Sequence, residues 1–491
     1  MGSDRLIIVS NRLPVTIRRT SNGLEAEPSS GGLVSALFPI FKAAGGCWVG
    51  WPGTGYATEI QKTLRRQCAD YFFEPVFLTE AERSHFYQGC SNEILWPLFH
   101  DFPSRCNFDP AYWNAYRDAT EKFADGVERV AHREDFVWVH DYHLMMLADA
   151  LRARDLRLNL SYFHHVPFPA PDIFEKLPWR AEVLRGLLQF NHLGFQTDRD
   201  KKNFVRCVQR LYPGTRLHKI GARRLLSSGG MHTEIRTSPV SIDYQSVALE
   251  AGGSAVRGRV QELRQAFEGK QIILGLDRLD YTKGIPERLL GYRMLLENRP
   301  ELRGRVVLLQ VVVPSRQDIP EYVELKVKIE QLVSEINGKY GQPGWSPVVY
   351  LHRSVPLCEL LGLYRAAHVA LVTPLKDGMN LVAKEFCAAR SDDRGVLILS
   401  EFAGSAAELK EGAVLINPFD LESIASALQL ALTMPDSDQR VRMRAMRDVI
   451  ERYDLLQWFK SCCGRISLRN LEGGQSSDEF TDPFPLGLQT A

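Results

Sequence analysis

The sequence lacks long apolar runs, a strong net charge of either sign and any clustering of cysteines that suggests a metal or disulfide framework. No segment of its 491 residues approaches the roughly 18 consecutive apolar residues of a membrane span, and the first apolar run, Leu6 to Val9, is too short for a signal peptide. The formal net charge of +1 argues against bulk electrostatic binding to nucleic acid or to an anionic membrane. We therefore expect a soluble protein with neither as a partner.

The nine cysteines are odd in number and scattered, apart from the adjacent Cys462 and Cys463. No CxxC motif or zinc-ligand spacing occurs, so the sequence predicts neither a structural metal nor a disulfide framework. Free thiols of this kind suit a reducing compartment, and we expect a cytoplasmic location.

The length and an ordinary composition, 45% hydrophobic and 24% charged, allow two to three globular domains. Alternating strand and helix patterns stop near residues 240–256, where PVSID gives way to Ala-Gly-Gly-Ser, and begin again after Gln271. This pattern predicts an α/β protein with domains at 1–243 and 244–460. The polar, Pro- and Gly-containing residues 473–491 are expected to be disordered.

The stretch 368–385 is the most informative one in the chain. Val369 to Thr373 form an unbroken apolar or β-branched run, which is typical of a parallel strand buried on both faces. Pro374 ends it, Asp377 and Gly378 supply a turn, and Asn380 is placed to cap a helix. The first amides of such a helix can bind a phosphate or diphosphate, although an ordinary strand-to-helix connection has the same pattern.

The same arrangement recurs, because several apolar runs are followed at once by charged or hydrogen-bonding residues. These are Asn11-Arg12, Asp141, His164-His165, Asp277-Arg278 and Ser315-Arg316. In an open parallel sheet, ligands bind outside the carboxyl ends of the strands. We therefore expect these side chains to line clefts at such edges, and two sheets facing each other would make a single deep site.

Arg278 and Lys283 lie five residues apart, just before a helix predicted to begin near Pro286. Two cations at a helix start suit a diphosphate, although a surface salt-bridge cluster with nearby carboxylates would have the same spacing. Gly31 and Gly32 precede another helical run and could let a ligand approach the backbone, or could form a plain turn.

Three further segments carry predictions of their own. Residues 84–100, with Tyr87, Trp96 and His100, have poor periodicity and are predicted to form a loop whose aromatic side chains either stack on sugar rings or simply pack. His165 follows a strand and could bind a substrate hydroxyl or be structural. The segment from Thr197 to Arg224 is basic, and we predict a helical, solvated face.

Eight motifs together resemble the trehalose-6-phosphate synthase family of retaining glycosyltransferases over about residues 5–460. They are SNR at 10–12, SNEILWPLFH at 91–100, HDYHL at 140–144, HHVPFPAPDIF at 164–174, LDRLDYTKGIPERL at 276–289, SEINGKYG at 334–341, LKDGMNLVAKEF at 375–386 and LSEFAGSAAEL at 399–409. The resemblance implies a GT-B fold, in which two Rossmann-like domains with parallel sheets face a central cleft. The first domain would bind the acceptor and the second the nucleotide-sugar donor.

The resemblance also implies roles for individual residues. Catalysis would involve Arg278, Lys283, Asp141 and His165. Donor binding would involve Gly31, Gly32, Val355, Asp377, Leu381, Val382, Ala383, Lys384 and Glu385, and acceptor binding Arg12, Tyr87, Trp96, Asp141 and Arg316. No metal or other cofactor is implied, since the nucleotide-sugar is a co-substrate.

The implied reaction joins glucose from a nucleotide-glucose, UDP-glucose in most of the family, to glucose 6-phosphate, giving α,α-trehalose 6-phosphate. The nucleobase stays open between UDP, ADP and GDP, and so does homo-oligomerisation. PVSID at 239–243 departs from the more usual Pro-Ile-Gly-Ile-Asp, and Ser241 in place of glycine leaves acceptor identity less certain than donor chemistry.

Two alternatives remain beside this reaction. One is the same donor chemistry with another phosphorylated acceptor, such as glycerol 3-phosphate or a cyclitol phosphate. The other is a non-catalytic regulatory subunit that binds sugar phosphate, although the intact Arg278, Lys283 and Glu385 argue against it. No DxDxT phosphatase motif occurs, so a separate phosphatase is expected to act downstream.

Overall fold

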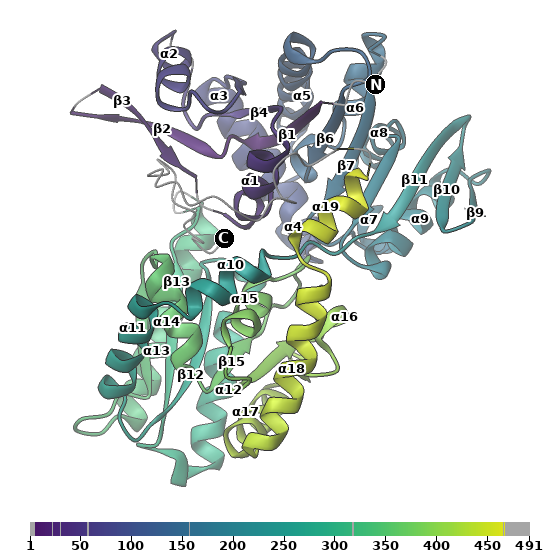
Figure 1. The fold of residues 1–491 in the computed structure, drawn as a ribbon. Coiled ribbons are helices and arrows are strands. Elements are labelled where there is room, and N and C mark those ends of the chain that lie inside the picture. Colours follow the sequence, from purple (N-terminus) through teal and green to yellow (C-terminus); the bar gives the residue numbers. More distant parts are fainter. Residues whose placement is uncertain are drawn as a thin grey trace. The chain divides into compact units, whose positions relative to one another are not determined.

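The computed structural model describes residues 5–21, 23–29, 31–55, 58–156, 158–316, 319–464 and 466. The described residues form two compact units (Figure 1): unit 1 takes in those within 5–29, 37–239 and 459–466, and unit 2 those within 31–36 and 240–458. The sequence predicted domains at 1–243 and 244–460. The tail predicted at 473–491 lies outside the described residues. None of the helices in the described ranges has the length and apolar character that a membrane span requires.

Unit 1 contains a nine-stranded sheet in the order β5-β4-β1-β6-β7-β8-β11-β10-β9 and a separate antiparallel pair, β2 and β3. The seven strands from β5 to β11 in this order run parallel, and β9 and β10 add an antiparallel hairpin at one edge. The strands are β1 (Leu6–Arg12), β2 (Val15–Thr20), β3 (Gly23–Pro28), β4 (Cys47–Trp51), β5 (Phe73–Pro75), β6 (Phe136–His140), β7 (Asn159–His164), β8 (His192–Phe195), β9 (Arg216–Ile220), β10 (Arg223–Ser228) and β11 (Met231–Thr237).

The helical segments of unit 1 connect these strands. They are α1 (Gly32–Ala44), which begins in unit 2, α2 (Thr58–Gln67), α3 (Glu80–Glu82), η1 (Arg83–Leu95), α4 (Trp96–Phe99), η2 (Pro103–Arg105), α5 (Pro110–Val130), η3 (Tyr142–Leu144), α6 (Leu147–Ala153), α7 (Pro171–Phe174), α8 (Arg180–Leu188), α9 (Asp198–Leu211) and α19 (Leu455–Cys463), which also begins in unit 2. The central strands β4 and β6 are buried at every residue, as their continuous apolar sequences predict.

Unit 2 is built on a six-stranded parallel sheet in the order β14-β13-β12-β15-β16-β17. Its strands are β12 (Gln271–Arg278), β13 (Val306–Val313), β14 (Val348–His352), β15 (Val369–Val372), β16 (Val396–Ser400) and β17 (Val414–Ile416). Its helical segments are α10 (Tyr244–Ala251), α11 (Ser254–Ala266), η4 (Tyr281–Lys283), α12 (Ile285–Asn298), η5 (Pro300–Leu302), α13 (Pro320–Tyr340), α14 (Leu357–Ala366), α15 (Leu381–Ala389), α16 (Ala406–Leu409), α17 (Leu421–Thr433) and α18 (Asp436–Arg452).

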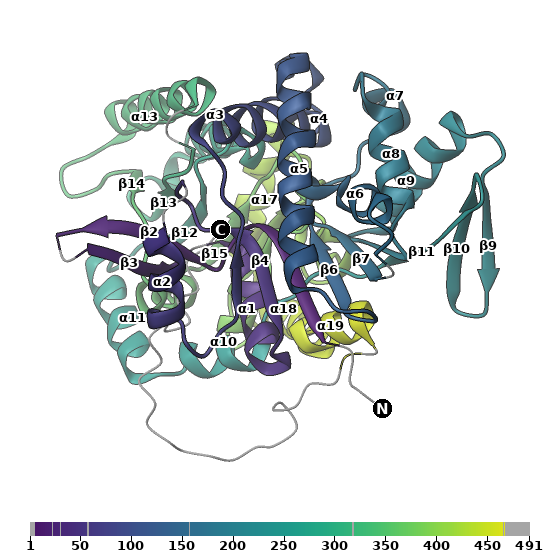
Figure 2. The ribbon, with the colours of Figure 1, turned by 90° about the horizontal axis from the view of Figure 1, so that it is seen from above.

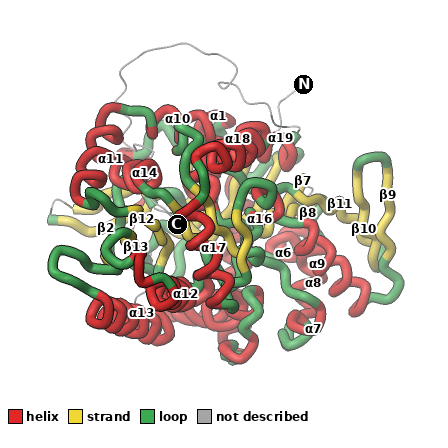
Figure 3. Tube along the Cα trace, turned by 90° about the horizontal axis from the view of Figure 1, so that it is seen from below, coloured by secondary structure: helices red, strands yellow, loops and turns green. Residues whose placement is uncertain are grey.

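Helices cover both faces of the sheet of unit 2 (Figure 3), and the inner strands β13, β15 and β16 are buried at every residue. Side chains alternate along β12: Ile272, Leu274 and Leu276 join the apolar cluster formed with α10, α11, α14, α15 and α18. The intervening Gly275 and Asp277 point to the opposite face. There they meet the polar side chains that organise the candidate site.

Two predictions from the sequence are wrong. Residues 84–100 are not a loop, because Arg83–Leu95 form a π-helix (η1) that continues into α4. A π-helix closes its turns over five residues, so its buried positions follow neither the 3.6-residue nor the two-residue period that sequence reading tests. Nor is Thr197–Arg224 helical throughout. The helix α9 ends at Leu211, and Arg216–Ile220 pairs with Arg223–Ser228 in a hairpin that extends beyond the rest of the sheet (Figures 1 and 2).

Candidate active site

In unit 2, the strand order reverses between β12 and β15. From β12 the chain adds β13 and β14 on one side, and then returns to add β15, β16 and β17 on the other. Ligands of open α/β sheets bind at the carboxyl ends of the strands at such a reversal. Here β12 ends in Asp277 and Arg278, and β15 is followed by Thr373 and the loop to α15. The topology therefore selects the segments that the sequence analysis singled out.

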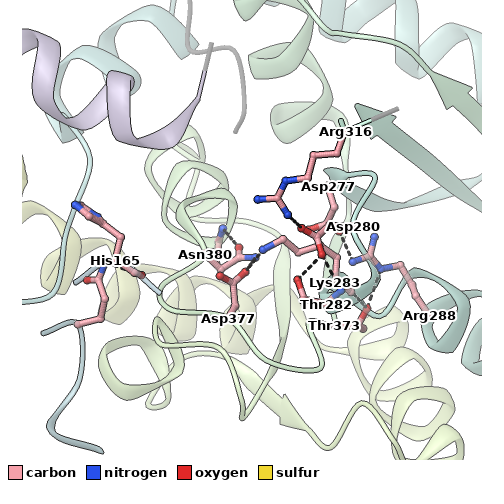
Figure 4. Close-up of polar contacts among 12 residues, drawn as sticks. His165, Asp277, Asp280, Thr282, Lys283, Arg288, Arg316, Thr373, Asp377 and Asn380 are labelled. Atoms are coloured by element: carbon pink, nitrogen blue, oxygen red, sulfur yellow. Dashed lines mark hydrogen bonds and ion pairs between the residues drawn. The ribbon is translucent and has the colours of Figure 1, made fainter. Parts of the chain in front are cut away.

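Lys283 and Asp377 meet at this edge although they are far apart in the sequence. The Lys283 Nζ lies 2.6 Å from the Asp377 Oδ2, and the two side chains are only 10% and 13% exposed. Asn380 Nδ2 donates to the same carboxylate oxygen at 3.2 Å (Figure 4). A predicted diphosphate-binding lysine and a predicted sugar-binding aspartate thus form one polar cluster.

Helix α15 starts at the same place, as predicted. Asn380 caps it in a left-handed conformation, φ 79°, with its side-chain oxygen accepting from the Ala383 amide at 3.2 Å. The amides of Leu381 and Val382 precede the first helical hydrogen bond and carry the positive end of the helix dipole. An anion can therefore be bound there by backbone alone.

The loop before α15 is fixed by residues that follow β16. The Asp377 amide donates to the Phe402 carbonyl at 3.2 Å, and the Gly404 amide returns a bond to the Asp377 carbonyl at 3.1 Å. A Cβ at Gly404 would lie 1.8 Å from the Gly378 carbonyl oxygen, so only glycine allows this approach. Asp377 is therefore held by backbone contacts that the sequence alone did not reveal.

Glu385 and Lys384, on the first turns of α15, have side chains that are buried within unit 2. Tyr364 donates to Glu385 Oε2 at 2.8 Å, and burial raises the pKa of Glu385 to about 7 despite this hydrogen bond. The Lys384 Nζ donates to the Val240 carbonyl at 2.9 Å and lies 2.7 Å from a Glu408 oxygen. The ammonium of Lys384 is thus engaged in internal contacts.

Arg288, which the sequence analysis did not identify, organises the inner side of the site. Its side chain is completely buried, pairs with Asp277, and donates to Thr373 Oγ1 at 3.1 Å and to Gln310 Oε1 at 3.3 Å. Gly275 leaves room for it, since a Cβ there would lie 2.7 Å from Arg288 Nη1. Burial raises the pKa of Asp277 even though Arg288 opposes the shift.

The same network fixes the turn that carries Lys283. Thr373 Oγ1 donates to the Gly284 carbonyl at 3.1 Å, and the Leu375 amide donates to the Thr282 carbonyl at 2.7 Å. Gly284 has φ +62°, and a Cβ there would lie 2.1 Å from the Thr373 carbonyl oxygen. The short distance between β15 and this turn therefore requires glycine.

The remaining predicted residues of unit 2 occupy nearby positions. Arg278 is half-buried at the end of β12, and Val355 is buried in the loop between β14 and α14. Arg316, with φ 48°, follows β13 and lies 3.6 Å from the Asp280 Oδ2. Burial acts to raise the pKa of Asp280, but the positive charges of Arg316, Lys283 and Arg278 outweigh it and the pKa is lowered.

Unit 1 has its own reversal of strand order, between β1 and β6. Arg12 ends β1; its guanidinium lies 4.7 Å from the centre of the Trp51 ring and donates to Thr16 Oγ1 at 3.0 Å. Burial lowers the pKa of Arg12, although the nearby Tyr87 opposes the shift. The predicted anion-binding arginine is thus held against an aromatic face.

Asp141 follows β6 in a backbone conformation that is rarely seen outside glycine, φ 74° and ψ 167°. The surrounding aromatics come from the π-helix η1, from α4 and from η3. Tyr87 stacks on His143 with ring centres 6.0 Å apart, and Trp96 lies 5.9 Å from Tyr142. Unit 1 therefore gathers the predicted acceptor residues Arg12, Tyr87, Trp96 and Asp141 around the carboxyl ends of β1 and β6.

His165 follows β7 and pairs with a second histidine. Its Nε2 lies 3.0 Å from the His140 Nδ1, and burial lowers the pKa of His165 to about 3. Its imidazole is therefore neutral and can exchange hydrogen bonds with a hydroxyl group. Gly32 is the first residue of α1, and Gly31 before it has φ +143° and open space at its Cβ position.

Two further predictions from the sequence concern Ser241 and metal binding. Ser241 is fully buried, so it has no exposed face to offer a substrate. Within the part of the chain that the structure describes, no group of three or more His, Cys, Asp or Glu side chains is arranged to hold a metal ion.

Comparison with known proteins agrees with this arrangement. The family model of glycosyltransferase family 20 matches residues 4–467. The alpha,alpha-trehalose-phosphate synthase (UDP-forming) A of Dictyostelium discoideum is 39% identical over 93% of this chain, which spans 61% of that relative's length.

Two solved structures extend the similarity to the fold. A UDP-forming alpha,alpha-trehalose-phosphate synthase from Burkholderia xenovorans in complex with glucose-6-phosphate superposes with a TM-score of 0.85 at 31% identity, covering 94% of this chain and all of that one. The Escherichia coli enzyme bound with UDP-2-fluoro glucose gives a TM-score of 0.85 at 34% identity, covering 95% and 99% of the two chains. The α/β fold is therefore of the GT-B class, and the chain belongs to glycosyltransferase family 20, that of the trehalose-6-phosphate synthases.

Proposed function

We propose that the protein transfers glucose from a nucleotide-glucose, with UDP-glucose the first candidate, to glucose 6-phosphate. The products are α,α-trehalose 6-phosphate and the nucleoside diphosphate, and the configuration at the anomeric carbon is retained. The observation that carries this proposal is the Lys283–Asp377 pair at the start of α15, beside Arg278 at the end of β12. It combines a diphosphate cation, a sugar-binding carboxylate and a helix N-terminus in one place.

On the donor side, Arg278 and Lys283 bind the diphosphate together with the amides of Leu381 and Val382. Ala383 and Lys384 contribute the backbone of the same helical turn. Asp377 binds hydroxyls of the transferred glucose, with His165, Gly31 and Gly32, while Glu385 binds the ribose and the backbone at Val355 contacts the base.

On the acceptor side, Arg12 and Arg316 bind the phosphate of glucose 6-phosphate, Tyr87 and Trp96 bind its ring, and Asp141 binds its hydroxyls. The cation–π geometry of Arg12 on Trp51 supports the first assignment, because it holds the guanidinium in place before a phosphate arrives. The strained backbone of Asp141 is the kind of feature that clusters at functional sites.

The reaction follows a front-face substitution. The C1–O bond to the diphosphate breaks, and the departing phosphate oxygen accepts the proton of the attacking hydroxyl as the new C1–O bond forms on the same face. Arg278, Lys283 and the start of α15 stabilise the negative charge that develops on the leaving group. Closure around both substrates would keep water from the activated sugar.

The partners of the protein are small molecules, namely the nucleotide-glucose and glucose 6-phosphate. No metal or other cofactor takes part in this scheme. The scheme also includes a cytoplasmic location, no membrane or nucleic-acid partner, and a separate phosphatase that consumes the product.

The test is nucleotide release from UDP-, ADP- and GDP-glucose, each with glucose 6-phosphate, followed by mass spectrometry of the product. A non-reducing disaccharide phosphate is the expected result, and the panel names the donor at the same time. Turnover with glycerol 3-phosphate or a cyclitol phosphate instead would replace the acceptor assignment. Nucleotide binding without turnover of any acceptor would replace catalysis with a regulatory role.

A further inference from the structure

Asp280 has no role in the scheme above, yet it is the most enclosed carboxylate of the site. Asp280 is 1% exposed and lies two residues after Arg278, in the segment that leads to Lys283. A buried carboxylate is costly unless it is paired and hydrogen-bonded. The partners of Asp280 therefore indicate why it is there.

One oxygen of Asp280 holds the turn that ends in Lys283. Oδ1 accepts from the Thr282 amide and from the Thr282 hydroxyl, both at 2.9 Å, and so caps the 3₁₀ turn η4. The Asp280 carbonyl also accepts from the Lys283 amide at 3.1 Å. Lys283 is thus tied to Asp280 by a backbone bond, and to the Asp280 carboxylate through Thr282.

The other oxygen faces Arg316. Oδ2 lies 3.6 Å from the Arg316 Nη1 and 3.5 Å from the Tyr322 hydroxyl, and Arg316 itself donates to that hydroxyl (Figure 4 shows Arg316 pointing at Asp280). Arg316 has a side chain only 10% exposed, and its φ of 48° fixes an uncommon backbone turn. Asp280 is therefore an anionic partner of this arginine.

We propose that Asp280 is a positioning residue that couples the two substrates: one carboxylate oxygen orients the Lys283 turn for the donor diphosphate, and the other orients Arg316 for the acceptor phosphate. This inference rests on the proposed function, because it takes the roles of Lys283 and Arg316 from it. A shift of Arg316 toward a bound phosphate changes the position of the Asp280 carboxylate and the positive charge that it faces. The bonds from Thr282 to Asp280 then transmit the change to Lys283. Binding of one substrate thereby favours binding of the other.

Substitutions at Thr282 and at Tyr322 each disrupt one half of this coupling and leave the other half intact. Thr282→Val removes a bond to Oδ1 without touching Arg316, and Tyr322→Phe removes contacts on the Oδ2 side without touching Lys283. Asp280→Asn keeps an oxygen for Thr282 but removes the charge that faces Arg316. Asp420→Asn is the matched control, because Asp420 also caps a helix of unit 2 but is exposed and accepts from the Ser423 amide.

Calorimetric titration of UDP and of glucose 6-phosphate into each folded variant, checked by thermal unfolding, measures the cross effects. Thr282→Val is expected to weaken glucose 6-phosphate binding, and Tyr322→Phe to weaken UDP binding, each by about fivefold. When Thr282→Val or Tyr322→Phe is combined with Asp280→Asn, each cross effect is expected to fall below about twofold, because Asp280→Asn has already removed the coupling.

A Thr282→Val protein that loses UDP affinity alone, and a Tyr322→Phe protein that loses glucose 6-phosphate affinity alone, would overturn the coupling in favour of two separate local roles. Cross effects of equal size in Asp420→Asn would overturn it too, as a general response to lost capping. An unmodified protein that binds neither ligand would overturn the proposed function together with this inference.

Discussion

The hydroxyl of Tyr364 donates to Glu385 at 2.8 Å inside unit 2, and both side chains are buried. Desolvation raises the pKa of Glu385 to about 7, from the ordinary 4.5. The carboxyl proposed to bind the ribose is therefore partly protonated near neutral pH, and its titration affects the folded state.

Because the pKa of Glu385 is higher in the folded chain than in the unfolded chain, the folded chain binds this proton more tightly. The associated stability is present in full below the unfolded pKa and is lost as pH rises toward about 7. Glu385→Gln removes this loss, so its stability relative to the unmodified protein is expected to increase by about 3 kcal/mol between pH 4 and pH 8. Urea unfolding at both pH values measures it, and parallel pH profiles for the two proteins would contradict it.

Loss of either diphosphate cation is expected to abolish most turnover while the fold survives. Lys283→Ala and Arg278→Ala each remove charge stabilisation from the leaving group and should lower kcat by about a hundredfold or more. Initial rates of nucleotide release measure the effect. Lys326→Ala, at a surface pair with Glu330, serves as the control and should keep normal rates. Near-normal turnover in the Lys283 or Arg278 variant would refute the leaving-group assignment.

Replacing Arg288 is expected to destabilise unit 2 strongly. Arg288→Met leaves Asp277 buried without its cation and removes the bonds to Thr373 and Gln310, at a cost of about 3–5 kcal/mol. Denaturant unfolding provides the measurement. Lys326→Met breaks an exposed pair of similar length, 2.7 Å, and should cost less than about 1 kcal/mol. Equal losses of unfolding free energy in the two variants would show that the buried network contributes no more to stability than the exposed pair.

Two glycines should respond to alanine in opposite directions. At Gly284, with φ +62° and a backbone oxygen 2.1 Å from the new Cβ, alanine forces the Lys283 turn away from β15, which should cost about 2 kcal/mol or more and reduce turnover. At Gly338, inside helix α13 and in open space, alanine should stabilise by about 1 kcal/mol. Thermal unfolding of both variants, with rate assays, distinguishes them. A stabilised Gly284→Ala protein would contradict the packing argument.

Sequence patterns predicted the elements that depend on interactions between residues close together in the chain. The strand predicted at Val369–Thr373, the cap at Asn380 and the helix after it follow from nearest neighbours. All three are confirmed, with the strand ending one residue earlier, at Val372. The polar residues after strands could be predicted to share an edge because parallel strands have their carboxyl ends on the same side.

The rest of the site depends on contacts between segments far apart in the chain. Arg288 sits in a helical sequence where an arginine is normally solvated, and only its pairing with Asp277 and Thr373 reveals its burial. The partnership of His140 with His165, and the cross-link from Gly404 to Asp377, have no local signal either. Such contacts are set by tertiary packing.

The π-helical winding of Arg83–Leu95 makes the length of this segment as important as its composition. Deleting one residue would let the chain relax to the tighter α-helical turn, and every later side chain would rotate by about 100° around the axis. Tyr87 and Trp96 would then no longer face His143 and Tyr142 together. In an alignment of related chains, a one-residue gap in this segment therefore indicates a different arrangement of the aromatic side chains, even where every motif residue is retained.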